Sequence, residues 1–143
     1  MVRVLFVCLG NICRSPMAEA VFQHKVRSVG LEGQIESDSA GTGHWHVGNP
    51  PHHGTRAQLT HHEIDYTHQA RLITEDDLNT FDYILTMDNQ NLRDVQALGI
   101  GKAVVRPFLD YTPGSAYHEV PDPYHTGGFE GVYALVGKRR RAC

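Results

Sequence analysis

The sequence predicts an α/β fold, a single-domain four-stranded parallel sheet with helices on both faces. Strand-like and helix-like segments alternate along the chain, which implies parallel strands joined by right-handed crossovers. The first segment, residues 2–7, is a valine-rich apolar run typical of a strand buried on both faces. At 143 residues, of which 41% are hydrophobic, the chain is expected to form one domain over residues 1–143.

The first helix is expected to begin at Ser15, because Pro16 suits the first turn of a helix and apolar residues then follow at helical spacing. Further strands are predicted at 35–40, 82–86 and 102–106. Further helices are predicted at 55–60, near 74–77, at 89–98 and at 129–138. Gly99 is expected to end the helix at 89–98, and a loop rich in Pro, Gly, Asp and Tyr fills residues 108–128.

The segment from Cys8 to Ser15 joins the first strand to the first helix. Backbone N–H groups at a helix N-terminus bind anions, and ligand sites of open α/β sheets lie at the carboxyl ends of strands. Helix N-termini and guanidinium groups also stabilise thiolates, so we expect Cys8 to be a thiolate nucleophile. The fold class therefore includes a phosphate-binding loop after the first strand.

The other residues of this loop suit a phosphate group. Arg14 can hold two phosphate oxygens with its planar fork and remains charged. Gly10 lets the backbone pass close to a ligand, and Asn11 tolerates the positive φ of a tight anion-binding turn. Ser15 can donate a hydrogen bond to the Cys8 sulfur. Together these residues predict attack of Cys8 on a phosphate ester.

The Cys-x5-Arg-Ser pattern resembles the low-molecular-weight protein tyrosine phosphatases. Segments that match this family in order are Asp-Ser-Ala-Gly-Thr at 38–42, Trp-His-Val-Gly at 45–48, Phe-Asp-Tyr-Ile-Leu-Thr-Met-Asp at 81–88 and Asp-Pro-Tyr at 122–124. The resemblance covers nearly the whole chain. It implies a redox-regulated enzyme that hydrolyses protein phosphotyrosine and small aryl phosphates through a phosphocysteine on Cys8.

Asp122 is the best candidate for the acid that protonates the leaving oxygen. It lies between Pro121 and Pro123, which stiffen the backbone on either side, although an ordinary turn aspartate has the same pattern. The resemblance implies that Asp122 is the general acid and then the base that activates water. Asp88 follows the third strand, so it is expected at the same sheet edge as Cys8, where it lines the pocket or caps the next helix.

The resemblance also assigns supporting roles. It implies that oxidised Cys8 is trapped as a reversible disulfide with Cys13. It further implies that Ser39 hydrogen bonds Asn11 and that His68 belongs to the same supporting network. Taken alone, Cys13 fits a small packing residue equally well, and the other two fit ordinary buried polar groups.

Aromatic side chains are expected to form the substrate walls. The resemblance places Trp45 and Tyr124 on either side of a phosphorylated ring, and Leu9 and Ile12 would form the apolar part. A deep slot of this kind favours phosphotyrosine, because the shorter phosphoserine cannot bring its phosphorus to Cys8. The residues expected to contact substrate are Leu9, Gly10, Asn11, Ile12, Cys13, Ser15, Trp45 and Tyr124.

The chain departs from the family at two positions of interest. His125 stands where many members carry a second tyrosine, which alters one wall of the groove. Glu63 stands where relatives often carry glycine. Because glutamate adopts positive φ less easily than glycine, we expect the helix at 55–60 to end differently.

Composition narrows the partners and the location. The net charge of −3 argues against non-specific nucleic-acid binding, and no run approaches the roughly 20 apolar residues that span a bilayer. Three cysteines fit a reducing cytoplasm, so we expect a cytoplasmic enzyme that acts on phosphotyrosine-containing proteins. The oligomeric state is not indicated.

No metal or other cofactor is expected. Seven of the ten histidines fall between His44 and His68, but their spacing matches no known metal site. Arg14 and the loop amides supply the positive charge that a metal would otherwise provide.

Three alternative activities remain on the sequence alone. An arsenate reductase of the same fold would need further cysteines, and none lies between Cys13 and Cys143. Protein-arginine phosphatases of this type carry threonine where this chain has Ile12. A cysteine phosphocarrier would not need Asp122.

Overall fold

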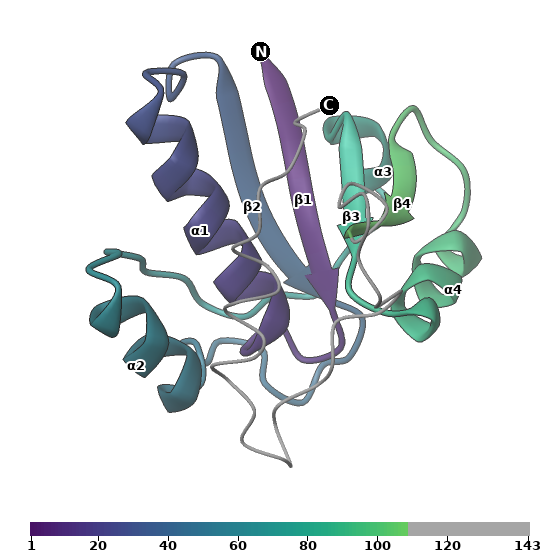
Figure 1. Cartoon of the computed structure of the whole chain (residues 1–143). Helices are drawn as coiled ribbons and strands as arrows, with labels where there is room; N and C mark the ends of the chain where they lie inside the picture. The colour runs from purple at the N-terminus through teal and green to yellow at the C-terminus, as the bar shows by residue number, and fades with distance from the viewer. Residues whose placement is uncertain (109–143) are drawn as a thin grey trace.

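The computed structural model describes residues 1–108 and confirms the predicted fold class (Figure 1). Its sheet has four strands, all parallel, in the order β2-β1-β3-β4. The strands are β1 (Val2–Cys8), β2 (Ile35–Gly41), β3 (Tyr83–Thr86) and β4 (Val104–Pro107). The first strand along the chain is therefore central, as its mostly apolar, valine-rich sequence predicted.

The helices cover both faces of this sheet. They are α1 (Arg14–Ser28), α2 (His53–His61), α3 (Asp77–Thr80) and α4 (Asn89–Leu98). In Figure 1, α1 and α2 lie on one side of the sheet and α4 lies on the other. Every element predicted up to residue 107 is present, with ends that move by a few residues. The predicted helix at 129–138 and most of the loop at 108–128 lie outside the described residues.

Alternate side chains of β1 supply the two halves of the core. Val4 and Phe6 belong to an apolar cluster with Met17 of α1 and Leu59 of α2. Side chains from the opposite face of β1 cluster with residues of α3, β3 and α4, namely Leu5, Val7, Leu78, Ile84 and Val95. The period-two alternation of a strand therefore lets β1 hold helices on both sides.

The register of the strands brings three of their carboxyl ends to one edge. Cys8 is paired with Gly41 of β2, and Val7 is paired with Thr86 of β3. The loop after Cys8 passes close over Gly41, because a Cβ at that glycine would lie 2.7 Å from the carbonyl oxygen of Leu9. A residue without a side chain therefore lets β2 end directly beneath the loop.

The end of α2 differs from our expectation. We expected Glu63 to avoid positive φ, but it adopts a φ of 59°, the conformation that glycine favours. Glu63 N donates to Thr60 O at 3.0 Å, and Ile64 N donates to Leu59 O at 2.8 Å. These bonds and the burial of Ile64 hold the glutamate in this conformation. The expected change at this helix end is therefore wrong.

Within residues 1–108, no helix combines the length and apolar character needed to cross a membrane.

Candidate active site

Cys8 lies at the carboxyl end of β1, and α1 begins six residues later at Arg14. The Cys8 side chain is buried, and its Sγ accepts a hydrogen bond from Asn11 N at 3.2 Å. Ser15 Oγ lies 3.1 Å from the same sulfur. Asn11 has a φ of 57°, as predicted, which turns the loop back toward Cys8. The sulfur therefore lies among hydrogen-bond donors at a helix N-terminus, a setting that stabilises negative charge.

Arg14 closes the far end of the loop. Its side chain is only 3% exposed, and its Nη1 lies 2.7 Å from Asp88 Oδ2. The other carboxylate oxygen of Asp88 accepts a hydrogen bond from Asn91 N at 2.7 Å and caps α4. The capping role that we considered for Asp88 is therefore confirmed. The same side chain also holds the arginine of the loop, which the sequence did not indicate.

The side chain of Asn11 holds the loop from inside. Its Oδ1 accepts hydrogen bonds from Arg71 N at 3.0 Å and from His68 Nε2 at 2.8 Å. Its Nδ2 donates to Ser15 Oγ at 2.8 Å and to Ser39 Oγ at 2.9 Å. The predicted contact between Ser39 and Asn11 is therefore present, and His68 belongs to the same network. The Asn11 amide is fully engaged, so the loop is held rigid before any ligand binds.

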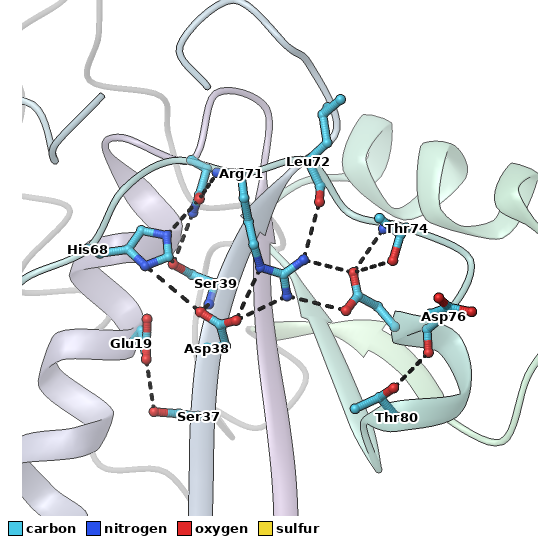
Figure 2. Close-up of polar contacts among 12 residues, drawn as sticks. Glu19, Ser37, Asp38, Ser39, His68, Arg71, Leu72, Thr74, Asp76 and Thr80 are labelled. Carbon is cyan, nitrogen blue, oxygen red and sulfur yellow. Dashed lines mark hydrogen bonds and ion pairs between the residues drawn. The ribbon is translucent and has the colours of Figure 1, made fainter. Parts of the chain in front are cut away.

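A second layer of polar residues lies behind this network (Figure 2). The Arg71 guanidinium reaches Asp38 Oδ2 at 3.1 Å and Asp77 Oδ2 at 3.0 Å, so it links β2 to α3. The Tyr66 hydroxyl donates to Glu19 Oε1 at 2.5 Å. Sequence reasoning did not assign a role to Glu19, Tyr66 or Arg71. The available signal was a glutamate four residues after Ser15, on the same face of the first helix.

Burial changes the protonation behaviour of this second layer. Burial raises the pKa of Glu19, and the hydrogen bond from Tyr66 opposes that shift. Burial, with the Glu19 carboxylate beside it, raises the pKa of Tyr66 far above its usual value. Burial also lowers the pKa of His68, an effect that the Asp38 carboxylate opposes. The Tyr66 hydroxyl therefore keeps its proton throughout the working pH range.

Among residues 1–108, three side chains with metal-ligand atoms gather in one place, and these are Glu19, Asp38 and His68. Each is already engaged within the protein. Glu19 accepts from Tyr66 and His68 bonds Asn11. Asp38 pairs with Arg71 (Figure 2). We therefore describe this cluster as support for the loop.

The predicted wall residues differ in exposure. Trp45 is 65% exposed and stacks on His44, with 5.3 Å between the ring centroids. Leu9 is 39% exposed, whereas Ile12 is buried with Cys13 and Ala70. Of these three predicted wall residues, Leu9 and Trp45 are therefore exposed and Ile12 is not.

Four other predicted site residues need separate mention. Gly10 lies against an imidazole, because a Cβ at this glycine would meet His46 Cδ2 at 3.0 Å. Cys13, like Cys8, is buried. Asp122 and Tyr124 lie outside the described residues.

Comparison with known proteins agrees with this geometry. A family model described as low molecular weight phosphotyrosine protein phosphatase matches residues 3–142. The low molecular weight protein-tyrosine-phosphatase YfkJ of Bacillus subtilis is 49% identical over 139 residues, which cover 95% of this chain and 89% of YfkJ. The crystal structure of YfkJ superposes with a TM-score of 0.93 and 48% identity, covering 96% of this chain and 88% of that chain.

Two other organisms supply further relatives. The low molecular weight phosphotyrosine protein phosphatase of Schizosaccharomyces pombe is 46% identical and covers 92% of this chain and 88% of its own. The crystal structure of a Drosophila arginine phosphatase has a TM-score of 0.89 at 34% identity, covering 94% of this chain and 90% of that chain. Since the family model spans residues 3–142 and the relatives match nearly the whole chain, the chain belongs to the low molecular weight phosphotyrosine protein phosphatase family.

Proposed function

We propose that this enzyme hydrolyses phosphotyrosine in proteins, and small aryl phosphates, through a phosphocysteine intermediate on Cys8. The observation that carries the proposal is the surroundings of the Cys8 sulfur. Asn11 N donates to it at 3.2 Å, and Ser15 Oγ lies 3.1 Å away. Such donors favour the thiolate, which is the nucleophilic form of cysteine.

The first half of the reaction transfers the phosphoryl group to sulfur. The Cys8 thiolate attacks phosphorus, an S–P bond forms and the P–O ester bond breaks. The phenolic oxygen takes a proton from Asp122. Arg14 and the loop amides stabilise the charge on the phosphoryl oxygens in the transition state.

The second half restores the thiolate. The Asp122 carboxylate takes a proton from water, the water oxygen attacks phosphorus, and the S–P bond breaks to release inorganic phosphate. Ser15 donates a hydrogen bond to the departing sulfur. The role of Asp122 rests on the family match over residues 3–142 and on its place in the Asp-Pro-Tyr segment.

The preference for an aryl ester rests on the walls of the site. Leu9 and Trp45 expose apolar and aromatic surface near the loop, and Tyr124 is proposed to complete the slot. A flat ring is favoured between such surfaces, and its length carries phosphorus to Cys8. We propose phosphotyrosine-containing proteins as the partners.

The first test is hydrolysis of para-nitrophenyl phosphate in the presence of EDTA. Cys8→Ser should abolish turnover, and Asp122→Ala should lower kcat by about 10²- to 10⁴-fold, as expected for loss of a general acid. Asp65→Ala, which removes an exposed carboxyl group, is the matched control and should retain activity. Turnover that survives Cys8→Ser would overturn the proposal, and a stable phosphocysteine without phosphate release would identify a phosphocarrier.

The second test concerns substrate class, because a Drosophila relative is named an arginine phosphatase. Matched peptides carrying phosphotyrosine or phosphoarginine should be compared by kcat/KM. We expect the phosphotyrosine peptide to be favoured, since Ile12 replaces the threonine associated with arginine phosphatases. Preference for phosphoarginine would reassign the substrate, and arsenate reduction would reassign the reaction.

A further inference from the structure

A series of buried and partly buried hydrogen bonds runs from the Cys8 sulfur to Glu19, a residue that the proposed reaction does not use. Glu19 lies on α1 and is 3% exposed. At the active-site end, Ser15 Oγ lies 3.1 Å from Cys8 Sγ and 2.8 Å from Asn11 Nδ2. Asn11 Nδ2 lies 2.9 Å from Ser39 Oγ. At the other end, the Tyr66 hydroxyl lies 3.4 Å from Ser39 Oγ and 2.5 Å from Glu19 Oε1. The direction in which each group donates decides how this series of hydrogen bonds acts on the Cys8 sulfur.

The orientation of the Asn11 amide is fixed by the main chain. Arg71 N donates to Asn11 Oδ1 at 3.0 Å, and a rotated amide would place two donors against each other. Both Nδ2 protons are then directed at the hydroxyls of Ser15 and Ser39. Because Ser15 accepts from Asn11, its own proton is available for the Cys8 sulfur.

The Ser39 hydroxyl also accepts from Asn11, so its proton needs an acceptor elsewhere. His68 Nε2 lies 3.1 Å from Ser39 Oγ and 2.8 Å from Asn11 Oδ1. An amide oxygen can only accept, so His68 Nε2 carries a proton and does not accept from Ser39. The Tyr66 oxygen lies 3.4 Å from Ser39 Oγ and can accept the Ser39 proton, and the Ser39 hydroxyl also stabilises the Glu19 carboxylate next to Tyr66.

Tyr66 can accept from Ser39 because its own proton is committed to Glu19. Glu19 Oε1 takes that proton at 2.5 Å, while Oε2 contacts Gln23 and Ser37. If Glu19 is protonated, the proton can reside on Oε2 and be donated to Ser37. Oε1 therefore remains an acceptor in either state, and the direction of the chain does not depend on ionisation of Glu19.

We propose that Tyr66, held by Glu19, is a positioning residue for the nucleophile in the proposed reaction. It accepts the Ser39 proton and so leaves the Ser39 oxygen to accept from Asn11 Nδ2. With Asn11 fixed in this way, the Ser15 hydroxyl is directed at Cys8 Sγ. Without the Tyr66 oxygen, the Ser39 hydroxyl must donate its proton to Asn11 Oδ1 or to His68 instead. The Asn11 amide is then less well fixed, and the Ser15 hydroxyl is no longer held in the orientation that donates to the Cys8 sulfur.

The test removes the Tyr66 oxygen by Tyr66→Phe and follows Cys8 directly. Alkylation of Cys8 by iodoacetamide, read by mass spectrometry across a pH series, reports its thiolate without any substrate. We expect the pH of half-maximal alkylation to rise by about 0.5 to 1 unit, the size expected for one hydrogen bond. With para-nitrophenyl phosphate, kcat/KM should fall by about 3- to 10-fold.

Tyr83→Phe is the matched control, because Tyr83 is partly buried against the same core and has no polar contact of its hydroxyl among the described residues. It should leave the alkylation profile unchanged. Glu19→Leu should shift the profile as Tyr66→Phe does, with the double variant no worse than either single variant. Glu19→Gln should keep the alkylation profile of the parent enzyme, since the glutamine amide oxygen still accepts from Tyr66.

An unchanged alkylation profile in Tyr66→Phe would overturn the inference, as would a Glu19→Gln profile shifted as far as that of Glu19→Leu. The alkylation measurement requires no turnover. Absence of phosphatase activity in the parent enzyme would therefore refute the proposed function without deciding the role of Tyr66.

Discussion

Arg14 Nη1 lies 2.7 Å from Asp88 Oδ2, and this ion pair ties the end of the loop to the segment after β3. Asp88 uses its other oxygen to cap α4 through Asn91 N. Since the arginine side chain is almost fully buried, the Asp88 carboxylate helps to offset the cost of burying its charge. One carboxylate thus fixes both the start of a helix and the guanidinium proposed to hold phosphate.

Asp88→Asn should weaken both contacts, because an amide offers one oxygen where the carboxylate offers two. We expect the free energy of unfolding to fall by about 1–3 kcal/mol, measured by urea denaturation. The KM for para-nitrophenyl phosphate should rise, because Arg14 is no longer held in place. Asp94→Asn, at a surface position of the same helix, should change stability by less than about 0.5 kcal/mol. Equal behaviour of the two variants would contradict the dual role of Asp88.

Gly41→Ala should push the loop out of place. The added Cβ would lie 2.7 Å from Leu9 O and 3.1 Å from Asn11 Cβ, both parts of the loop itself. Overpacking of this kind costs about 1–3 kcal/mol, and kcat/KM should fall because the loop moves. Gly33→Ala is the control, since a Cβ there has no heavy atom within 4 Å. Full activity of Gly41→Ala would show that the loop tolerates displacement.

Glu63→Gly should stabilise the protein. Glu63 has a φ of 59°, which glycine adopts without strain, so relief of strain outweighs the greater freedom of the unfolded chain. The expected gain is about 0.5–1 kcal/mol in thermal or urea unfolding. Glu63→Ala removes the same charge but keeps the strain, and should give no such gain. If both variants stabilise equally, the charge and not the backbone is responsible.

Glu19→Gln should change how stability depends on pH. Burial raises the pKa of Glu19 above its usual value of 4.5, so the folded protein holds this proton more tightly than the unfolded chain. The resulting stabilisation is complete below pH 4.5 and is lost as pH rises through the folded pKa. Between pH 4.5 and pH 7, the unfolding free energy of the parent should therefore fall relative to that of the variant. A difference that moves the other way would mean that hydrogen bonds outweigh burial.

Cys13→Ser tests the redox prediction. Peroxide should oxidise the Cys8 thiolate to a sulfenic acid, and the Cys13 thiol should then attack that sulfur, expel water and form a disulfide. Parent enzyme inactivated by peroxide should recover fully with dithiothreitol, whereas Cys13→Ser should recover only partly, because Cys8 proceeds to irreversible acids. Recovery that is the same in both proteins would rule out protection by Cys13.

The fold and the loop were predictable because their signals are local. The valine-rich run of β1 and the glycine after α4 each act within a few residues. The pairing of Arg14 with Asp88 joins residues 74 positions apart, and only the register of β1 against β3 brings them together. The sequence suggested that Asp88 lies at this edge but could not select its partner.

The supporting network was predictable only in part, for a different reason. Asn11, Ser39 and His68 came from family resemblance, whereas the contact that orients Asn11 is donated by the backbone of Arg71. Because almost every residue type has a backbone N–H, the sequence does not reveal which residue donates this bond. The prediction for Glu63 was wrong for the opposite reason. Glutamate does disfavour positive φ, but the burial of Ile64 overrides this local preference.

The backbone contact from Arg71 separates two tasks that one residue performs. Its side chain joins Asp38 to Asp77, while its N–H orients Asn11. Replacement of the side chain can alter the link to α3, yet any residue except proline retains the N–H. Substitutions at position 71 therefore affect the ion pairs of the side chain but not the hydrogen bond that the backbone N–H donates to Asn11. Descendants of this enzyme can lose the link between β2 and α3 while inheriting the alignment of the nucleophile loop unchanged.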